Sequence, residues 1–342
     1  MPNPRDPVAG DGPVFCCLRC GDSTPLPRCR HCHHEFESVD GIYQLTLDAD
    51  SNLDRRRGAT YIGYERVGAY FHGRDWAESA CDAGTMALGA KMSELTAAGT
   101  LLDVGCGGGR YAVPAALHGC TVIGGDISNG MLRLLLRKAA TNRVAPGRIV
   151  ACRLNALSLP LPEASVDGAT LNNVLHLVSE PERVISEVYR VLRPGGKLLT
   201  QVDVPTGDDR RNAGRNAEYD CREVEFHNRY WELLTERGIP LAPRNRSFNR
   251  HSTRLAAFEA VFGPGVRVDV PFSDRQVQSM TDAFLYRMGG KGFSAQQTVP
   301  DDIHEATFAR VVEEFRIKYG RDFGDLTCEI VTLGLALHVF EK

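Results

Sequence analysis

The 342-residue sequence lacks the features that would tie it to a membrane, to secretion or to nucleic acid. It has no apolar run of the roughly 18 residues that a membrane span requires. Its first residues, MPNPRDPVAGDGPV, lack the apolar stretch of a signal peptide. The formal net charge is only −3, so no overall basic field attracts RNA, DNA or anionic lipid. These absences favour a globular, cytoplasmic protein with no membrane partner, either a monomer or a homodimer.

Cysteine is abundant but unevenly placed, since five of the eleven cysteines lie between residues 16 and 32. This distribution suits a metal site in a reducing compartment better than a disulfide framework. Two C-x2-C pairs eight residues apart can close a tetrahedral site for structural Zn²⁺, and they consist of Cys17, Cys20, Cys29 and Cys32. Two alternative ligands are possible: Cys16 in place of Cys17, and His34 in place of Cys32. The alternative is a group of reduced cysteines without metal.

The order of apolar and polar segments predicts an α/β protein with additions at both ends. From Thr100 to Val204 strand-like and helix-like stretches alternate, which is typical of a parallel sheet. We find no internal repeat. The predicted segments are a disordered N-terminus (1–13), a zinc ribbon (14–47), a linker with helices (48–95), the α/β core (96–204), a largely helical cap with one strand near 266–272 (205–327), and a C-terminal core strand (328–342).

The stretch LLDVGCGGGRY, residues 101–111, predicts a buried strand that turns through a glycine-rich loop. A dinucleotide-binding G-x-G-x-x-G would need glycine at position 110, which is Arg110, and Asp103 would repel a pyrophosphate. Asp126 follows the next strand about 20 residues later, where an acid can bind both ribose hydroxyls. The implied ligand is a nucleoside that carries an ammonium group. A dehydrogenase or a nucleotide-free Rossmann fold is the alternative.

This ligand is consistent with S-adenosylmethionine, and residues 58–204 resemble the class I, type 11 methyltransferases. LLDVGCGGGRY and VIGGDIS are similar to that family's first two motifs, and RVLRPGGKLL to its closing motif. The resemblance implies a Rossmann-like fold of seven strands, mostly parallel, with the last strand antiparallel. The cofactor residues that it implies are Tyr61, Asp103, Gly105, Gly107, Asp126, Ile127, Asn155, Ala156 and Asn172.

Within this set the resemblance assigns Asp103 and the backbone near Gly105 to the methionine end and Asp126 to the ribose. Asn155 and Ala156 are implied to contact adenine, and Asn172 to lie beside the methionine. The family commonly has aspartate where Asn155 stands. The amide oxygen of asparagine can accept the same hydrogen bond from the adenine amino group.

Methyl transfer requires alignment of the nucleophile with the methyl group, and a base only where the nucleophile carries a proton. His176, expected at the end of the fourth strand, is the candidate catalytic base. A packing or hydrogen-bonding role for His176 is the alternative. Tyr61 and Tyr64 belong to a helix that covers the cofactor in this family, and they either close the pocket or pack in the core.

Two classes of acceptor are compatible with the sequence. The zinc ribbon partly resembles that of the 23S rRNA guanine-N1 methyltransferases, which makes RNA the alternative partner. However, residues 1–60 contain seven arginines against nine acids, whereas an RNA-binding surface should be basic. The arginine-rich run PRNRSFNRHSTR, residues 243–254, is a solvated loop or a site for phosphate or an acidic substrate. We expect a small-molecule acceptor. A zinc-ribbon interaction protein with a vestigial fold is disfavoured by the intact Asp103 and Asp126.

Overall fold

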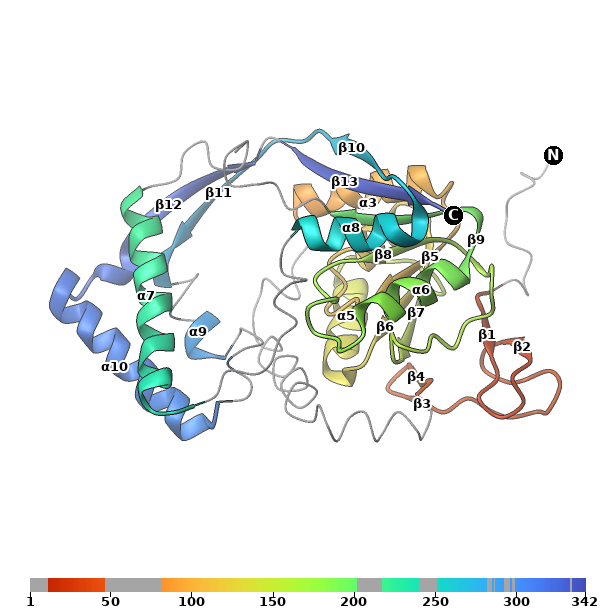
Figure 1. Ribbon diagram of the computed structural model, residues 1–342, viewed down its shortest axis with the longest axis horizontal. Coiled ribbons are helices and arrows are strands. Elements are labelled where there is room, and N and C mark those ends of the chain that lie inside the picture. The colour runs from red at the N-terminus through yellow and green to blue at the C-terminus, as the bar shows by residue number, and fades with distance from the viewer. Residues whose placement is uncertain are drawn as a thin grey trace.

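The computed structural model describes residues 12–46, 81–201, 217–239, 251–281, 285, 287–291, 296, 299–332 and 334–342. It has a larger α/β body and a smaller, mainly helical body, which two long antiparallel strands connect (Figure 1). Among the described residues, no helix is long and apolar enough to cross a bilayer.

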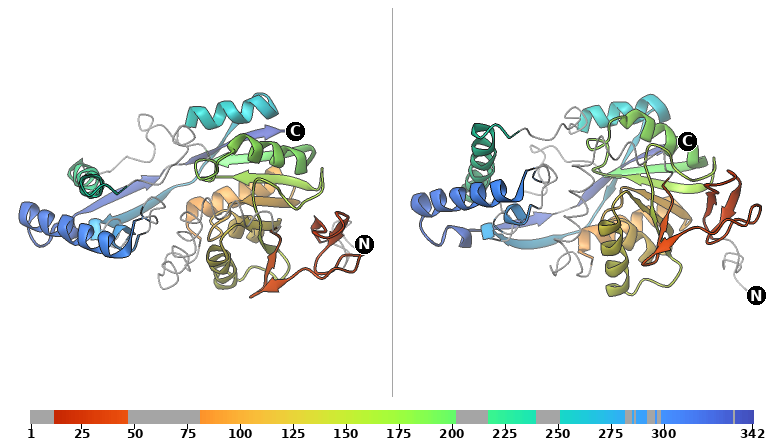
Figure 2. Two further views of the ribbon diagram at one scale, coloured as in Figure 1. Left: turned by 60° about the horizontal axis from the view of Figure 1, so that its bottom comes forward. Right: turned by 90° about the horizontal axis from the view of Figure 1, so that it is seen from below.

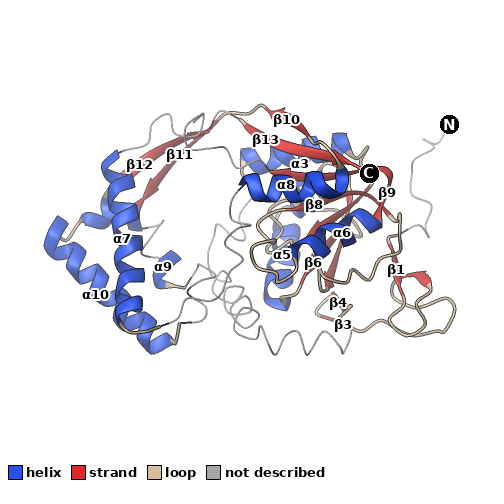
Figure 3. Ribbon diagram, in the orientation of Figure 1, coloured by secondary structure: helices blue, strands red, loops and turns tan. Residues whose placement is uncertain are grey.

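A nine-stranded mixed sheet forms the centre of the larger body (Figure 3). Its strands, in order across the sheet, are β10 (Val266–Val270), β13 (Leu335–Glu341), β9 (Leu192–Gln201), β8 (Val166–Leu171), β5 (Thr100–Val104), β6 (Thr121–Asp126), β7 (Ile149–Arg153), β4 (Ile42–Gln44) and β3 (Ser38–Val39). Strands β5 to β9 pair in parallel, and β13 is antiparallel to both of its neighbours. These strands and β10 are the seven expected, so the predicted fold class is confirmed.

Helices cover both faces of the sheet, which explains why its central strands are apolar on both sides (Figure 2). One face packs against α3 (Ala83–Leu95), α4 (Ala112–Leu117) and α5 (Asn129–Thr141). The other packs against α6 (Pro181–Val191) and α8 (His251–Phe262). Successive residues of β5 divide accordingly, with Leu101 in the first buried cluster and Leu102 in the second.

The N-terminal segment joins this sheet directly. After the short antiparallel pair β1 (Val14–Cys16) and β2 (Ser23–Pro25), the chain forms the hairpin of β3 and β4. Strand β4 then pairs in parallel with β7, with Tyr43 opposite Cys152, and β3 becomes the edge strand on this side of the sheet. Phe15 and Phe36 are buried in the same cluster as the core leucines. The cysteine-rich segment is therefore continuous with the α/β body.

The smaller body, which we call the cap, has its own apolar core. It consists of α7 (Ala217–Glu236), β11 (Asp274–Ser279), α9 (Arg287–Gly289), α10 (Asp301–Tyr319), the 3-10 helix η4 (Phe323–Asp325) and β12 (Thr327–Thr332). Phe226 and Tyr230 of α7 are buried with Val311 and Phe315 of α10. The antiparallel strands β11 and β12 follow β10 and precede β13 in the chain, so one long two-stranded ribbon connects cap and core (Figure 1).

We predict that Phe258→Ala in α8 will lower the free energy of unfolding of the α/β body by about 3–5 kcal/mol. Phe258 is 1% exposed, and its ring centroid lies 5.4 Å from that of Phe340 in β13. Val266→Ala is the control, because Val266 is 65% exposed on the edge strand. Denaturant unfolding of both variants measures the difference, and an equal effect would contradict this account of the core.

Candidate cofactor site and cysteine cluster

The glycine-rich loop after β5 is held against the end of β6. Both Gly105 N–H and Cys106 N–H donate to Gly125 O, at 2.7 and 3.0 Å. Gly105 has a φ of +67°, and a Cβ there would lie 2.3 Å from Val174 Cγ2. Gly107 also has a positive φ, but within the described part of the chain a Cβ there would meet no atom within 4 Å. The backbone is thus packed at Gly105 and open to a ligand at Gly107.

Asp126 connects this loop to the start of α5. Its Oδ2 accepts from Gly107 N–H and its Oδ1 from Ser128 N–H, both at 2.9 Å. A carboxylate offers about four acceptor positions, which suits the recognition of ligand hydroxyls. The side chain expected to bind ribose therefore also fixes the two loops around it. The sequence did not reveal this second role.

Asp103 lies in β5 and is only 2% exposed. Its Oδ2 is buried and has no hydrogen-bond partner within the described part of the chain. Burial, and to a smaller extent the charge of Asp126, raise the pKa of Asp103 to about 7, against the opposing effect of a hydrogen bond from the Ala112 backbone. A buried carboxylate oxygen without a partner is costly, and an ammonium group would satisfy it. Asp103 therefore fits the amino end of the expected cofactor.

The turn after β7 carries the residues expected at the adenine. Asn155 Oδ1 accepts from Leu157 N–H at 3.0 Å, and Ser158 N–H donates to Asn155 O at 3.1 Å. The Asn155 side chain thus closes its own turn. An amide oxygen can accept two hydrogen bonds, so this role is compatible with a contact to adenine. Arg153 Nε donates to Ile127 O at 3.1 Å, which places the turns after β6 and β7 side by side. Ala156 lies in the second of these turns.

Asn172 makes contacts that the sequence did not indicate. Its Oδ1 accepts from Gln201 N–H at 2.7 Å, and its Nδ2 donates to Thr170 Oγ1 at 2.6 Å. Tyr111 OH, at the end of the glycine loop, donates to Gln201 Oε1 at 2.5 Å. Asn172 therefore connects the ends of β8 and β9, and Gln201 connects both to the glycine loop. The sequence analysis missed Gln201, which could have been found as a polar residue at the end of a predicted strand.

His176 lies in a turn five residues beyond Leu171, the last residue of β8, and is half-buried. It is therefore further from the strand than we expected from the sequence. Tyr61 and Tyr64 lie outside the described residues. The remaining predicted cofactor residues meet at the carboxyl ends of β5, β6, β7 and β8, the edge where ligands bind in open α/β sheets.

The four predicted cysteine ligands form one cluster. The Sγ atoms of Cys17, Cys20, Cys29 and Cys32 all lie within 4.8 Å of one another. Backbone N–H groups of Cys32 and His31 point at the Cys29 sulfur and lower the pKa of that thiol to about 6, which favours the thiolate that binds metal. Neither Cys16 nor His34 belongs to this group among the described residues. The donor set and its tetrahedral spacing fit Zn²⁺.

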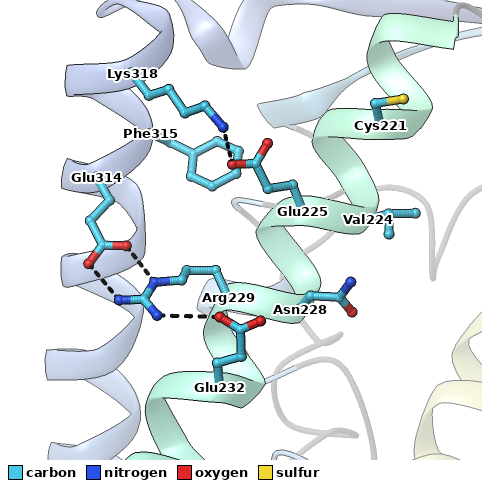
Figure 4. A pocket seen from close by; sticks show the side chains of 9 residues that line it. All are labelled: Cys221, Val224, Glu225, Asn228, Arg229, Glu232, Glu314, Phe315 and Lys318. Carbon is cyan, nitrogen blue, oxygen red and sulfur yellow. Dashed lines mark hydrogen bonds and ion pairs between the residues drawn. The ribbon is translucent and has the colours of Figure 1, made fainter.

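The cap has a surface groove between α7 and α10 (Figure 4). Arg229 donates to both carboxylate oxygens of Glu314, at 2.7 and 3.2 Å, and lies 3.3 Å from Glu232. Lys318 pairs with Glu225 across the same groove. These ion pairs join the two helices, and the groove lies on elements remote from the glycine loop. We assign it no part in the candidate site.

The comparisons with known proteins agree with this geometry. Residues 102–200 match the family described as a methyltransferase domain. Over 103 residues the chain is 37% identical to a demethylmenaquinone methyltransferase of Symbiobacterium thermophilum, which covers 29% of this chain and 40% of the relative. Over 114 residues it is 42% identical to the ubiquinone/menaquinone biosynthesis C-methyltransferase UbiE of Methylobacterium nodulans, covering 31% and 44%. The chain thus spans less than half the length of these two relatives.

The solved structure of the YcgJ protein from Bacillus subtilis aligns with 75% of this chain and 98% of its own, at 19% identity and a TM-score of 0.41. That similarity is too distant to inform function. The strand order, the glycine loop and the acid after the second strand define the class I methyltransferase fold. Residues 102–200 are a methyltransferase domain of this class, which confirms the family expected from the sequence.

We predict that binding of S-adenosylhomocysteine will weaken about tenfold for each pH unit between pH 7 and 5.5. The pKa of Asp103 is about 7, so below this pH the carboxyl is protonated and must lose its proton when an ammonium binds. The ligand ammonium itself stays charged in this range. Calorimetry of the wild type and of Asp103→Asn tests this.

The Asp103→Asn variant should bind more weakly at pH 7 and lose the pH dependence. Asp269→Asn is the control, because Asp269 lies on an exposed strand and should change neither result. An affinity of the wild type that is constant from pH 7 to 5.5 would contradict a role for the Asp103 charge.

Proposed function

We propose that the protein is an S-adenosylmethionine-dependent methyltransferase that acts on a small-molecule acceptor. The observation that carries the proposal is the buried Oδ2 of Asp103, which has no hydrogen-bond partner within the described residues, beside a glycine loop whose backbone meets no described atom at Gly107. These features suit a ligand with an ammonium group and a ribose better than a dinucleotide pyrophosphate. The methyltransferase family match over residues 102–200 supports the same cofactor.

The cofactor supplies an activated methyl group, so the protein's task is to bind, align and exclude water. In this proposal Asp103 holds the amino group, Asp126 accepts from the ribose hydroxyls, and Asn155 with the Ala156 backbone contacts adenine. Zn²⁺ at the cysteine cluster has a structural role, because four protein ligands leave no position for water or substrate. His176 remains our candidate for the base.

A small-molecule acceptor is supported by two observations. The relatives are named as methyltransferases of demethylmenaquinone and of ubiquinone/menaquinone biosynthesis, which are small-molecule pathways. The N-terminal 60 residues also carry more acids than arginines, which disfavours the zinc ribbon as an electrostatic RNA handle. The arginine-rich run favours the RNA alternative, but residues 243–250 lie outside the described part of the chain.

The experiment that tests the proposal uses S-adenosylmethionine labelled on its methyl group. The purified protein is incubated with it and a cell extract, which is then separated into RNA and small-molecule fractions. We expect label in the small-molecule fraction. Label confined to RNA would support the guanine-N1 alternative, and no label in either fraction would contradict the methyltransferase assignment.

Asp126→Ala should weaken binding of S-adenosylhomocysteine about tenfold to hundredfold, because a charged acceptor contributes about 1.5–3 kcal/mol. The variant also removes the hydrogen bonds to Gly107 and Ser128, so weaker binding alone would not show that Asp126 contacts the ribose. A comparison of two nucleosides that differ only in their ribose hydroxyls separates the two effects. The wild type should prefer adenosine to 2′,3′-dideoxyadenosine in calorimetry, and Asp126→Ala should lose this preference. Retention of the preference would refute ribose recognition by Asp126.

His176→Ala tests the candidate base. If His176 removes a proton from the acceptor, incorporation of label at saturating cofactor should fall about a hundredfold while affinity for S-adenosylhomocysteine is unchanged. A change of less than about threefold in rate would favour a packing role for the half-buried side chain.

A further inference from the structure

The N-terminal cysteine segment contacts the part of the cofactor site that would hold adenosine. Figure 1 shows β3 and β4 beside the β6–β7 side of the sheet, and the register places Gln44 opposite Arg153. The segment is thus not an appendage at a distance from the site. Its contacts fall on two separate stretches of the α/β core.

The first stretch is the loop between β6 and α5, residues 126–129. Gln44 Nε2 donates to Asn129 Oδ1 at 3.2 Å, three residues beyond Asp126. Leu45 N–H donates to Arg153 O at 2.8 Å, and the side chain of the same arginine donates to Ile127 O. The end of β4 is therefore tied to this loop by one direct contact and one through Arg153.

The second stretch is the turn and extended segment after β7, residues 155–161. Cys16 N–H donates to Pro160 O at 3.0 Å. Phe15 is fully buried in one cluster with Leu157 and Leu159 of this segment. On its other side the segment is held by α6, where Arg190 donates to Leu159 O and Leu161 O. The turn that carries Asn155 is therefore supported by the residue just before Cys17.

The cysteine cluster is close in the chain to both contacts. Cys16 immediately precedes the ligand Cys17, whose turn closes through Gly21 N–H to Cys17 O at 2.8 Å. From the other knuckle, Phe36 N–H donates to Pro27 O, and Gln44 N–H donates to Glu37 O at 3.0 Å. Strands β1 to β4 have only two or three residues each, too few to hold this arrangement without a further constraint.

We infer that metal-loaded Cys17, Cys20, Cys29 and Cys32 position the adenosine half of the cofactor site, through Gln44 on the loop of residues 126–129 and Cys16 on the segment of residues 155–161. This inference rests on the proposed function. It gives the zinc ribbon a role inside the enzyme that needs no macromolecular partner.

The test compares ligand affinity in four samples of the full-length protein. They are the purified protein with its zinc verified by metal analysis, the same protein stripped with a chelator, Gln44→Ala, and the control Asp40→Ala. Asp40 lies in the β3–β4 hairpin and pairs with Arg133 of α5 at 3.0 Å. Asp40→Ala therefore removes another contact between this hairpin and α5, the helix that also carries Asn129. That pair is largely exposed and should contribute little.

We expect the Kd of S-adenosylhomocysteine to rise at least tenfold on zinc removal and to recover when Zn²⁺ is restored. Gln44→Ala should raise the Kd about threefold to tenfold, because it removes a partly buried hydrogen bond to Asn129, and Asp40→Ala should raise it less than twofold. Adenosine alone should lose affinity by the same factors, because only its half of the site is affected. Asp103→Asn should weaken binding of S-adenosylhomocysteine without weakening that of adenosine.

Amide hydrogen exchange of the same samples separates positioning from general destabilisation. Zinc removal should accelerate exchange at residues 127–131 and 154–161 but leave α7 in the cap unchanged. Unaltered affinity and exchange after zinc removal and in Gln44→Ala would overturn the inference. Failure of the zinc-loaded wild type to bind S-adenosylhomocysteine would instead overturn the proposed function, and the inference with it.

Discussion

The candidate site depends on the carboxylate of Asp126, which accepts one backbone hydrogen bond from each of two loops. Through Gly107 it fixes the turn after β5, and through Ser128 it fixes the start of α5. Ser128 in turn accepts from Met131 N–H as the N-cap of that helix. One side chain thus sets the distance between the two loops that a nucleoside would contact. Both donors are backbone N–H groups, so these hydrogen bonds do not depend on the side chains of the neighbouring residues.

The same carboxylate imposes an electrostatic constraint on its neighbour. Asp103 is buried in the adjacent strand, and desolvation together with the charge of Asp126 raises its pKa. Two acids at one end of a sheet repel each other, and a positively charged ligand relieves that repulsion. The site therefore carries a cost in the free protein that binding removes. Buried acids with a raised pKa, such as Asp103, are typical of ligand-binding sites.

Much of the core was predictable because its signals are local. The alternation of apolar strands and amphipathic helices fixed five parallel strands, and the departure from G-x-G-x-x-G identified the kind of ligand. The pairing of β4 with β7 was not predictable, because a three-residue strand carries no periodicity and its partner lies more than a hundred residues away. The contact of Tyr111 with Gln201 is similarly non-local. For Asn155 and Asn172 the sequence indicated a place near the cofactor but not the backbone groups that each side chain also binds.

The two ends of the candidate site are supported by different parts of the chain. Residues 126–129 and 155–161 contact the N-terminal segment, whereas the ends of β8 and β9 are joined by Asn172. The cap has a separate apolar core around Phe226 and Phe315 and reaches the sheet through the two-stranded ribbon. The cap and the Asp126 contacts thus belong to separate apolar clusters, so the cap can vary without disturbing those contacts. This separation is consistent with a family match limited to residues 102–200.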